Sequence, residues 1–127
     1  MPYKILIIEE DRMNLKLFSE ILSLNGYEPL EARNALDGIR LVMSEKPHLI
    51  IMAIDSLSSN EFKIFEIMKS DASLKDIPVI ALSPFATKWT RKKFLELGFS
   101  DCIAKPFDLR EFIKIVKKHL YRGNGAE

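Results

Sequence analysis

The stretch Leu49-Ile50-Ile51-Met52-Ala53-Ile54-Asp55 decides the fold. It is an apolar run without alternation, which is typical of a strand buried on both faces of a parallel sheet. Segments with the periodicity of amphipathic helices lie on either side of it in the chain. We therefore place this run at the centre of an α/β sheet. The chemistry at its end, where Ala53 precedes Asp55, becomes the main question about function.

Four more short apolar runs are predicted to be strands, at residues 4–8, 27–32, 78–82 and 101–104. They alternate with five amphipathic helices, and the run at 27–32 is less apolar and so nearer an edge. Strands of this kind, alternating with helices, indicate a parallel sheet covered on both sides. Because crossovers are right-handed, we predict a doubly wound five-stranded sheet of order 2-1-3-4-5.

Capping residues and periodicity predict the helix ends and the buried faces. Asp11, Asn34 and Asp108 are expected N-caps, Ser58 and Glu61 have the spacing of a capping box, and Asn25-Gly26 ends the first helix. The positions expected on the buried faces are Leu17, Phe18, Ile21 and Leu22 in the first helix, Ala35, Ile39 and Val42 in the second, Phe62, Ile64, Phe65 and Met68 in the third, and Leu109, Phe112, Val116 and Leu120 in the fifth.

The composition is typical of a single globular domain. The chain has 127 residues, 47% hydrophobic and 29% charged, with a formal net charge of +1, which gives no reason to expect nucleic acid or a membrane surface as partner. We see no signal-peptide pattern and no apolar run long enough to span a bilayer. The single Cys102 excludes an internal disulfide and suits a reducing cytoplasm. We expect one cytoplasmic domain over residues 1–122 and a disordered tail over residues 123–127.

Polar side chains follow several of the predicted strands. Glu9 and Glu10 follow the first strand, Asp55 the third, Ser83 the fourth and Lys105 the fifth. The carboxyl ends of parallel strands meet at one edge of the sheet, so these groups are expected to converge. Crowded carboxylates need a compensating cation, which a divalent metal ion or Lys105 could supply. The plainer alternatives are helix N-terminal acids, a salt bridge from Lys105 to one of the glutamates, and a simple strand-end hydroxyl at Ser83.

Four pieces in this order and spacing resemble the receiver domain of two-component response regulators, closest to the stand-alone single-domain kind. They are residues 7–11 (Ile-Ile-Glu-Glu-Asp), the run at 49–55, residues 81–83 (Ala-Leu-Ser) and residues 104–106 (Ala-Lys-Pro), within a resemblance that covers residues 3–121. The resemblance implies a flavodoxin-like fold. It also implies a magnesium site made by Glu9, Glu10 and the backbone carbonyl of Asp55, with Ser83 and Lys105 contacting a phosphoryl group.

Position 53 breaks the family pattern. In the family, an aspartate there accepts a phosphoryl group from a histidine kinase or phosphotransfer protein, and Ala53 has no nucleophilic oxygen. The following loop carries Leu57 and Glu61 where Pro and Gly are usual, Glu10 is one methylene longer than the usual Asp, and Cys102 occupies the aromatic switch position. A laboratory change from Asp to Ala would explain position 53 alone. The neighbouring departures favour a naturally degenerate receiver.

We therefore predict a pseudo-receiver that is not an enzyme. It would require no cofactor, would bind magnesium weakly if at all, and would be a monomer or weak dimer. Its expected partners are a histidine kinase, a phosphotransfer protein or another regulator, with no nucleic acid and no membrane. The fourth and fifth helices, or the first, would form the docking surface. Trp89 is either an interface residue there or packs on its own helix.

Two alternatives stay open. The first is an active receiver phosphorylated on Asp55, although two further residues add roughly 6–7 Å of rise and would carry that carboxylate out of the pocket. The second is a flavin or nucleotide binder, which the acids after the first strand disfavour because they repel phosphate. Among the remaining reactive side chains, Cys102 is expected to be a small core residue. His48 and His119 are expected to be surface residues without zinc-ligand spacing.

Overall fold

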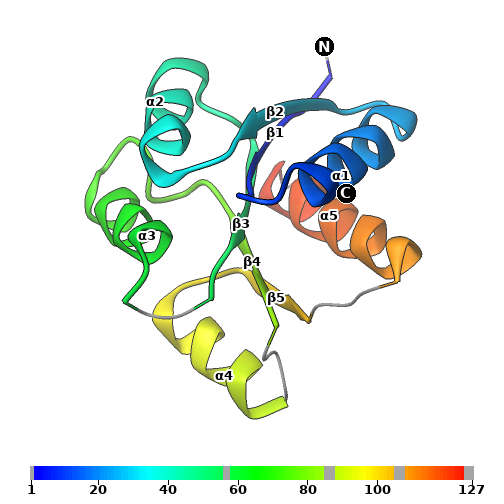
Figure 1. Cartoon of the computed structure of the whole chain (residues 1–127). Coiled ribbons are helices and arrows are strands. Elements are labelled where there is room, and N and C mark those ends of the chain that lie inside the picture. Colours follow the sequence, from blue (N-terminus) through cyan, green and yellow to red (C-terminus); the bar gives the residue numbers. More distant parts are fainter. Residues whose placement is uncertain (1, 56–57, 85–87, 105–107, 125–127) are drawn as a thin grey trace.

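Five parallel strands form the centre of the molecule. A computed structural model describes residues 2–55, 58–84, 88–104 and 108–124, with the backbone alone for residues 88–89 and 122–124. The strands are β1 (Lys4–Ile8), β2 (Glu28–Ala32), β3 (Leu49–Ala53), β4 (Val79–Ser83) and β5 (Asp101–Ala104). Their order is β2-β1-β3-β4-β5 (Figure 1), which confirms the predicted topology. β1 and β5 have the predicted bounds, and β2 begins one residue later than predicted. β4 begins and ends one residue later, and β3 ends at Ala53, two residues before the end of the predicted run.

The five helices of the described chain cover both faces of this sheet. α1 (Arg12–Leu24) and α5 (Leu109–Asn124) lie on one face, and α2 (Ala35–Glu45), α3 (Asn60–Ser70) and α4 (Lys88–Leu97) lie on the other (Figure 1). None of the helices described combines the length and apolar character that crossing a bilayer requires. α5 reaches Asn124, two residues beyond the predicted domain end, and positions 125–127 of the predicted tail lie outside the described residues.

β3 contributes to both hydrophobic cores. Ile50 and Met52 belong to the core beneath α2, α3 and α4, whereas Leu49 and Ile51 belong to the core beneath α1 and α5. All four side chains are 0% exposed. Because β1 and β4 pair with the two edges of β3, no side of this strand faces water. A polar residue at these positions would be desolvated without a partner, which explains the unbroken apolar run.

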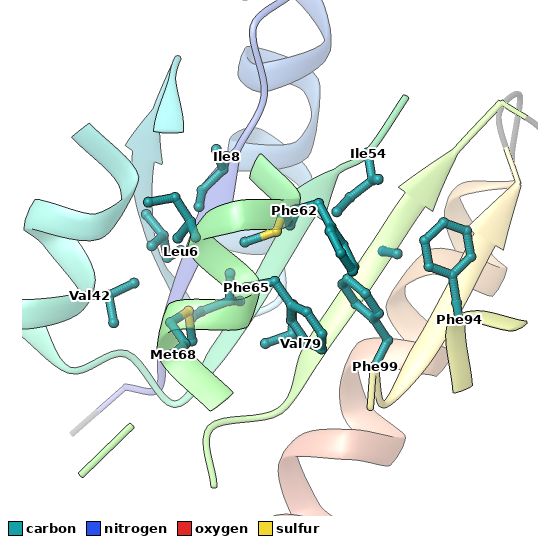
Figure 2. Close-up of a cluster of buried hydrophobic side chains, with 14 of the residues drawn as sticks. Leu6, Ile8, Val42, Ile54, Phe62, Phe65, Met68, Val79, Phe94 and Phe99 are labelled. Carbon is teal, nitrogen blue, oxygen red and sulfur yellow. The ribbon is translucent and has the colours of Figure 1, made fainter. Parts of the chain in front are cut away.

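Stacked aromatic rings fill the core beside α3 and α4. The rings of Phe65 and Phe99 lie 3.7 Å apart between centroids with an interplanar angle of 9°, and Phe62 lies 6.3 Å from Phe99 (Figure 2). Phe94 of α4 meets Phe99 edge-on at 5.3 Å. These contacts join α3 to the turn between α4 and β5, and they confirm the predicted buried face of the third helix.

The predicted N-caps of α1 and α2 are confirmed, and that of α3 is corrected. The side chain of Asp11 accepts two backbone N–H groups of the first turn of α1, and the side chain of Asn34 accepts one in α2. In α3 the N-cap is Ser59, whose hydroxyl accepts the N–H of Phe62 at 3.2 Å. The prediction of Ser58 was wrong by one residue. Glu61 therefore lies in the first turn of α3 but not at the capping-box position.

Periodicity placed one side chain of α1 on the wrong face. Leu17 is 42% exposed, whereas Leu15 is buried together with Phe18. Successive helical residues are turned by about 100°, so the residue before Phe18 points away from the core. The other predicted positions are buried or partly buried: Phe18, Ile21, Leu22, Ala35, Ile39, Val42, Phe62, Ile64, Phe65, Met68, Leu109, Phe112, Val116 and Leu120.

His119 is buried, which contradicts the expected surface position, whereas His48 is exposed as predicted. His119 follows Val116 by three residues and so lies on the buried stripe of α5. Its Nε2 lies 3.0 Å from Oδ2 of Asp101, the buried first residue of β5. A carboxylate on a neighbouring element gives the imidazole a partner inside the protein. The periodicity of α5 alone contains no information about that partner.

Acid is expected to weaken the fold partly through Asp101. Burial acts to raise the pKa of this carboxyl, but the hydrogen bond with His119, the N–H of Cys102 and the charge of Arg91 together hold the pKa below its ordinary value of 3.8. The ionised carboxylate therefore stabilises the fold fully above that value, and this contribution is lost as the pH falls through the lower folded-state pKa. We expect wild type to exceed Asp101→Asn in free energy of unfolding at neutral pH, with a difference that shrinks below about pH 4. Urea unfolding over a pH series measures this difference, and a constant difference would contradict the assignment.

Candidate functional site

A cavity of about 550 Å³ opens where β1 and β3 end. Ligands of open α/β sheets bind beyond the carboxyl ends of the strands, so this is the expected edge. The cavity lies between the end of β1, the start of α1, the residue after β2, the end of β3 and the first turn of α3. Its lining residues are Ile8, Glu9, Glu10, Asp11, Arg12, Met13, Arg33, Ala53, Asp55 and Glu61.

Glu9 and Glu10 lie together in this lining, as the sequence predicted. Glu9 is 5% exposed, and its Oε2 accepts the backbone N–H of Asp11 at 3.2 Å. Glu10 is exposed. Oδ1 of Asp11 accepts the N–H groups of Met13 at 2.8 Å and Asn14 at 3.0 Å. The third acid is therefore engaged as the cap of α1, while Glu9 and Glu10 are the acids set at the end of β1.

Ala53 is the last residue of β3, and its side chain contributes only a methyl group to the cavity wall. It pairs in register with Leu82 of β4, and the N–H of Ile54 extends the ladder by donating to the carbonyl of Leu82 at 2.8 Å. Asp55 follows the end of the strand, is exposed and lines the same cavity. Whether the carboxylate of Asp55 can take the place of an acceptor stays a prediction. The last residue of β3, where the family carries its acceptor, is Ala53.

The cavity lining also contains two arginines that the sequence pattern did not indicate. Arg33 follows β2, and its Nε and Nη2 each lie 3.3 Å from the carbonyl oxygen of Glu10, to which they donate. Arg12 is the first residue of α1. In the sequence, Arg33 could have been identified as the residue directly after the second predicted strand. In the structure, the N–H of Glu9 donates to the carbonyl of Ala32 at 2.9 Å, so the residues that follow β1 and β2 lie side by side.

Of the two predicted phosphoryl-contact residues, Ser83 lies within the described part of the chain and is not among the described lining residues. Ser83 is the last residue of β4, is 2% exposed and pairs in register with Ala104. It is absent from the cavity lining. Lys105 and Leu57 lie outside the described residues, so the predicted salt bridge of Lys105 and the loop departure at Leu57 stay predictions.

Cys102, at the predicted switch position, is a buried core residue as expected. Burial and the neighbouring charge of Asp101 raise the pKa of its thiol to about 11, so this cysteine is held as a neutral thiol at ordinary pH. Trp89 belongs to the first turn of α4, and its side chain lies outside the described part of the structure. Its predicted interface role stays a prediction.

The lining of the cavity has more negative than positive side chains. It holds five carboxylate side chains and two guanidinium groups. Oxygen donors suit magnesium, which commonly uses one or two carboxylates together with water. Within the described residues, however, no group of three His, Cys, Asp or Glu side chains could hold a metal ion. An aspartate at position 53 would add a sixth carboxylate to the described lining.

Comparisons with known proteins agree with this geometry. Residues 5–117 match the family model of the response regulator receiver domain. The polar-differentiation response regulator DivK of Brucella anthropi is 32% identical over 120 residues, which cover 94% of this chain and 98% of that protein.

The fold agrees with solved structures as well. A response regulator from Desulfuromonas acetoxidans is 27% identical with a TM-score of 0.82, over 94% of this chain and 98% of that one. A CheY-like response regulator receiver domain protein from Methanospirillum hungatei JF-1, 21% identical, gives a TM-score of 0.86 over 100% of both chains and so shows the same fold. Sequence and structure thus select one family.

Proposed function

Because this chain belongs to the response regulator receiver domain family of two-component signalling, we propose that it acts by docking to a partner protein and accepts no phosphoryl group at position 53. One observation carries the proposal: Ala53 ends β3 in the wall of the acidic cavity. An acyl phosphate requires a carboxylate oxygen as nucleophile, and a methyl group offers none. In this proposal the module is not an enzyme and requires no cofactor.

The docking surface that we propose lies on α4 and α5. Lys92 and Lys93 on α4 and Lys114, Lys117 and Lys118 on α5 are all exposed. No ion pair within the described part of the chain involves these five lysines. Unpaired cations on two helices that both contact Asp101 of β5 favour a partner with an acidic surface. A histidine kinase, a phosphotransfer protein or another regulator with such a surface fits the proposal.

The first test is phosphoryl uptake. Wild type incubated with acetyl phosphate and Mg²⁺ should stay unmodified, because position 53 lacks the acceptor oxygen, and Ala53→Asp should gain a phosphoryl group. Phosphate-affinity gels and intact-protein mass spectrometry measure the uptake, with Ala53→Asn as the matched control. Phosphorylation of wild type on any aspartate would overturn the proposal.

Phosphorylation of Asp55 is a second candidate function, favoured because Asp55 lines the same cavity as Glu9 and Glu10. The same assay separates it from the main proposal. Uptake by wild type that Asp55→Asn abolishes supports the second candidate. No uptake by either protein supports the first.

The second test concerns charge in the cavity. Without metal, Ala53→Asp should be less stable than Ala53→Asn by about 1 kcal/mol at low ionic strength, because it adds a like charge beside Glu9 and Glu10. Magnesium should bind wild type weakly and bind Ala53→Asp about tenfold more tightly, since the aspartate supplies the missing carboxylate. Urea unfolding and magnesium titrations followed by amide shifts measure the two effects. Equal magnesium affinities would show that the cavity is no relic of a metal site.

The third test concerns docking. Lys117→Glu should weaken binding of a kinase or phosphotransfer partner, isolated by pull-down from the native cell, by about tenfold, and added salt should reduce the loss. Lys63→Glu makes the same exposed charge reversal on α3 and should leave the affinity unchanged. Affinity measured by calorimetry decides the matter. Equal affinities for the two variants would remove the basic surface of α4 and α5 from the proposal.

A further inference from the structure

A buried carboxylate joins three elements at the β5 edge of the sheet. Asp101, the first residue of β5, is 1% exposed. Its Oδ1 lies 2.8 Å from Nη2 of Arg91 on α4 and 2.8 Å from the backbone nitrogen of Cys102, which donates to it. Its Oδ2 lies 3.0 Å from Nε2 of His119 on α5. We call Arg91, Asp101 and His119 the Asp101 cluster.

Asp101 depends on Arg91, His119 and the N–H of Cys102 for its polar contacts. A buried carboxylate is strongly destabilising unless donors replace its lost hydration. Here both oxygens are engaged, by one donor from α4, one from β5 itself and one from α5. Removing one donor leaves part of a desolvated charge uncompensated, so the position of each helix affects the energy of the whole cluster.

Arg91 gives α4 a polar anchor in addition to its apolar contacts. Among the described side chains of α4, Phe94 is the fully buried one, and Thr90 and Leu97 are partly buried. Arg91 precedes Phe94 by three residues, so the two side chains share one face of the helix. Its side chain is 50% exposed, which means that it reaches the buried carboxylate from the surface.

We infer that the Asp101 cluster locks α4 and α5 onto β5, so that the face made by these three elements keeps one arrangement without any phosphoryl signal. Because Arg91 is half-exposed, it is the member of the Asp101 cluster that a ligand from solvent can reach. An anionic group that withdrew its guanidinium from Asp101 would remove the ion pair that joins α4 to β5 and leave the apolar contacts of residues such as Phe94 and Leu97. The inference rests on contacts within the chain and goes beyond the proposed function, since it holds whether or not a partner docks there.

Cys102 offers a direct measurement of α4 opening. It is the single cysteine of the chain, is 5% exposed and belongs to the same core cluster as Phe94 and Phe99. A thiol in that core reacts with iodoacetamide only when the covering structure opens. The alkylation rate of the native protein therefore reports how often the region around α4 separates from β5.

The deciding comparison is Arg91→Gln against Lys92→Gln. Both substitutions remove one positive charge from an exposed position of α4, but Lys92 has no ion pair among the described residues. We expect alkylation of Cys102 to be about tenfold faster in Arg91→Gln than in Lys92→Gln. Hydrogen exchange should show the added opening in the amides of α4 and not throughout the sheet.

A second arm uses α5. His119→Leu should also accelerate alkylation of Cys102, and His119→Gln, which keeps an N–H donor, should restore part of the protection. Urea unfolding of every variant gives the fraction of alkylation that passes through global unfolding. Equal rates in Arg91→Gln and Lys92→Gln, or an increase in Arg91→Gln fully explained by global unfolding, would overturn the lock. Neither outcome bears on phosphoryl uptake at position 53, so failure of this inference is distinct from failure of the proposed function.

Discussion

The burial of β3 on both faces constrains the rest of this molecule. A strand without a polar face needs hydrogen-bonded neighbours at both edges and helices against both sides. β1, β4 and the two helical layers supply this cover (Figure 1). The same parallel arrangement brings the ends of β1 and β3 to one edge of the sheet. The cavity with Glu9, Glu10 and Ala53 is thus a consequence of how the core is built.

The cavity has an acidic lining, and the last residue of β3 adds no charge to it. Its carboxylates outnumber its guanidinium groups, and Arg33 and Arg12 are the cations that the described lining holds. Ala53 supplies neither an oxygen nucleophile nor a carboxylate ligand at this position. An alanine there is compatible with the apolar packing of β3 against both helical layers.

At the β5 edge of the sheet, a buried carboxylate has a structural role. At the amino end of β5, Asp101 is surrounded by donors from α4, β5 and α5. Its charge is compensated inside the protein, whereas Glu10 and Asp55 of the cavity are exposed. The acidic cavity lies where β1 and β3 end, whereas the Asp101 cluster lies at the amino end of β5.

The sequence alone determined the order of the sheet and the approximate bounds of its strands. It also determined the caps Asp11 and Asn34 and the buried face of α3. The position of Glu9, Glu10 and Ala53 at one edge of the sheet followed from the same pattern. These features follow from periodicity and local hydrogen bonding, which short stretches of chain express. Tertiary structure decided the rest. Leu15 is buried instead of Leu17 because the core contacts one face of α1, and His119 is buried with its Nε2 hydrogen-bonded to the carboxylate of Asp101 on another element. Arg33 and Asp55 reached the cavity through the paths of loops. Contacts between residues that are distant in the chain produce no periodic pattern in the sequence. They are therefore determined by the packing of the elements in three dimensions.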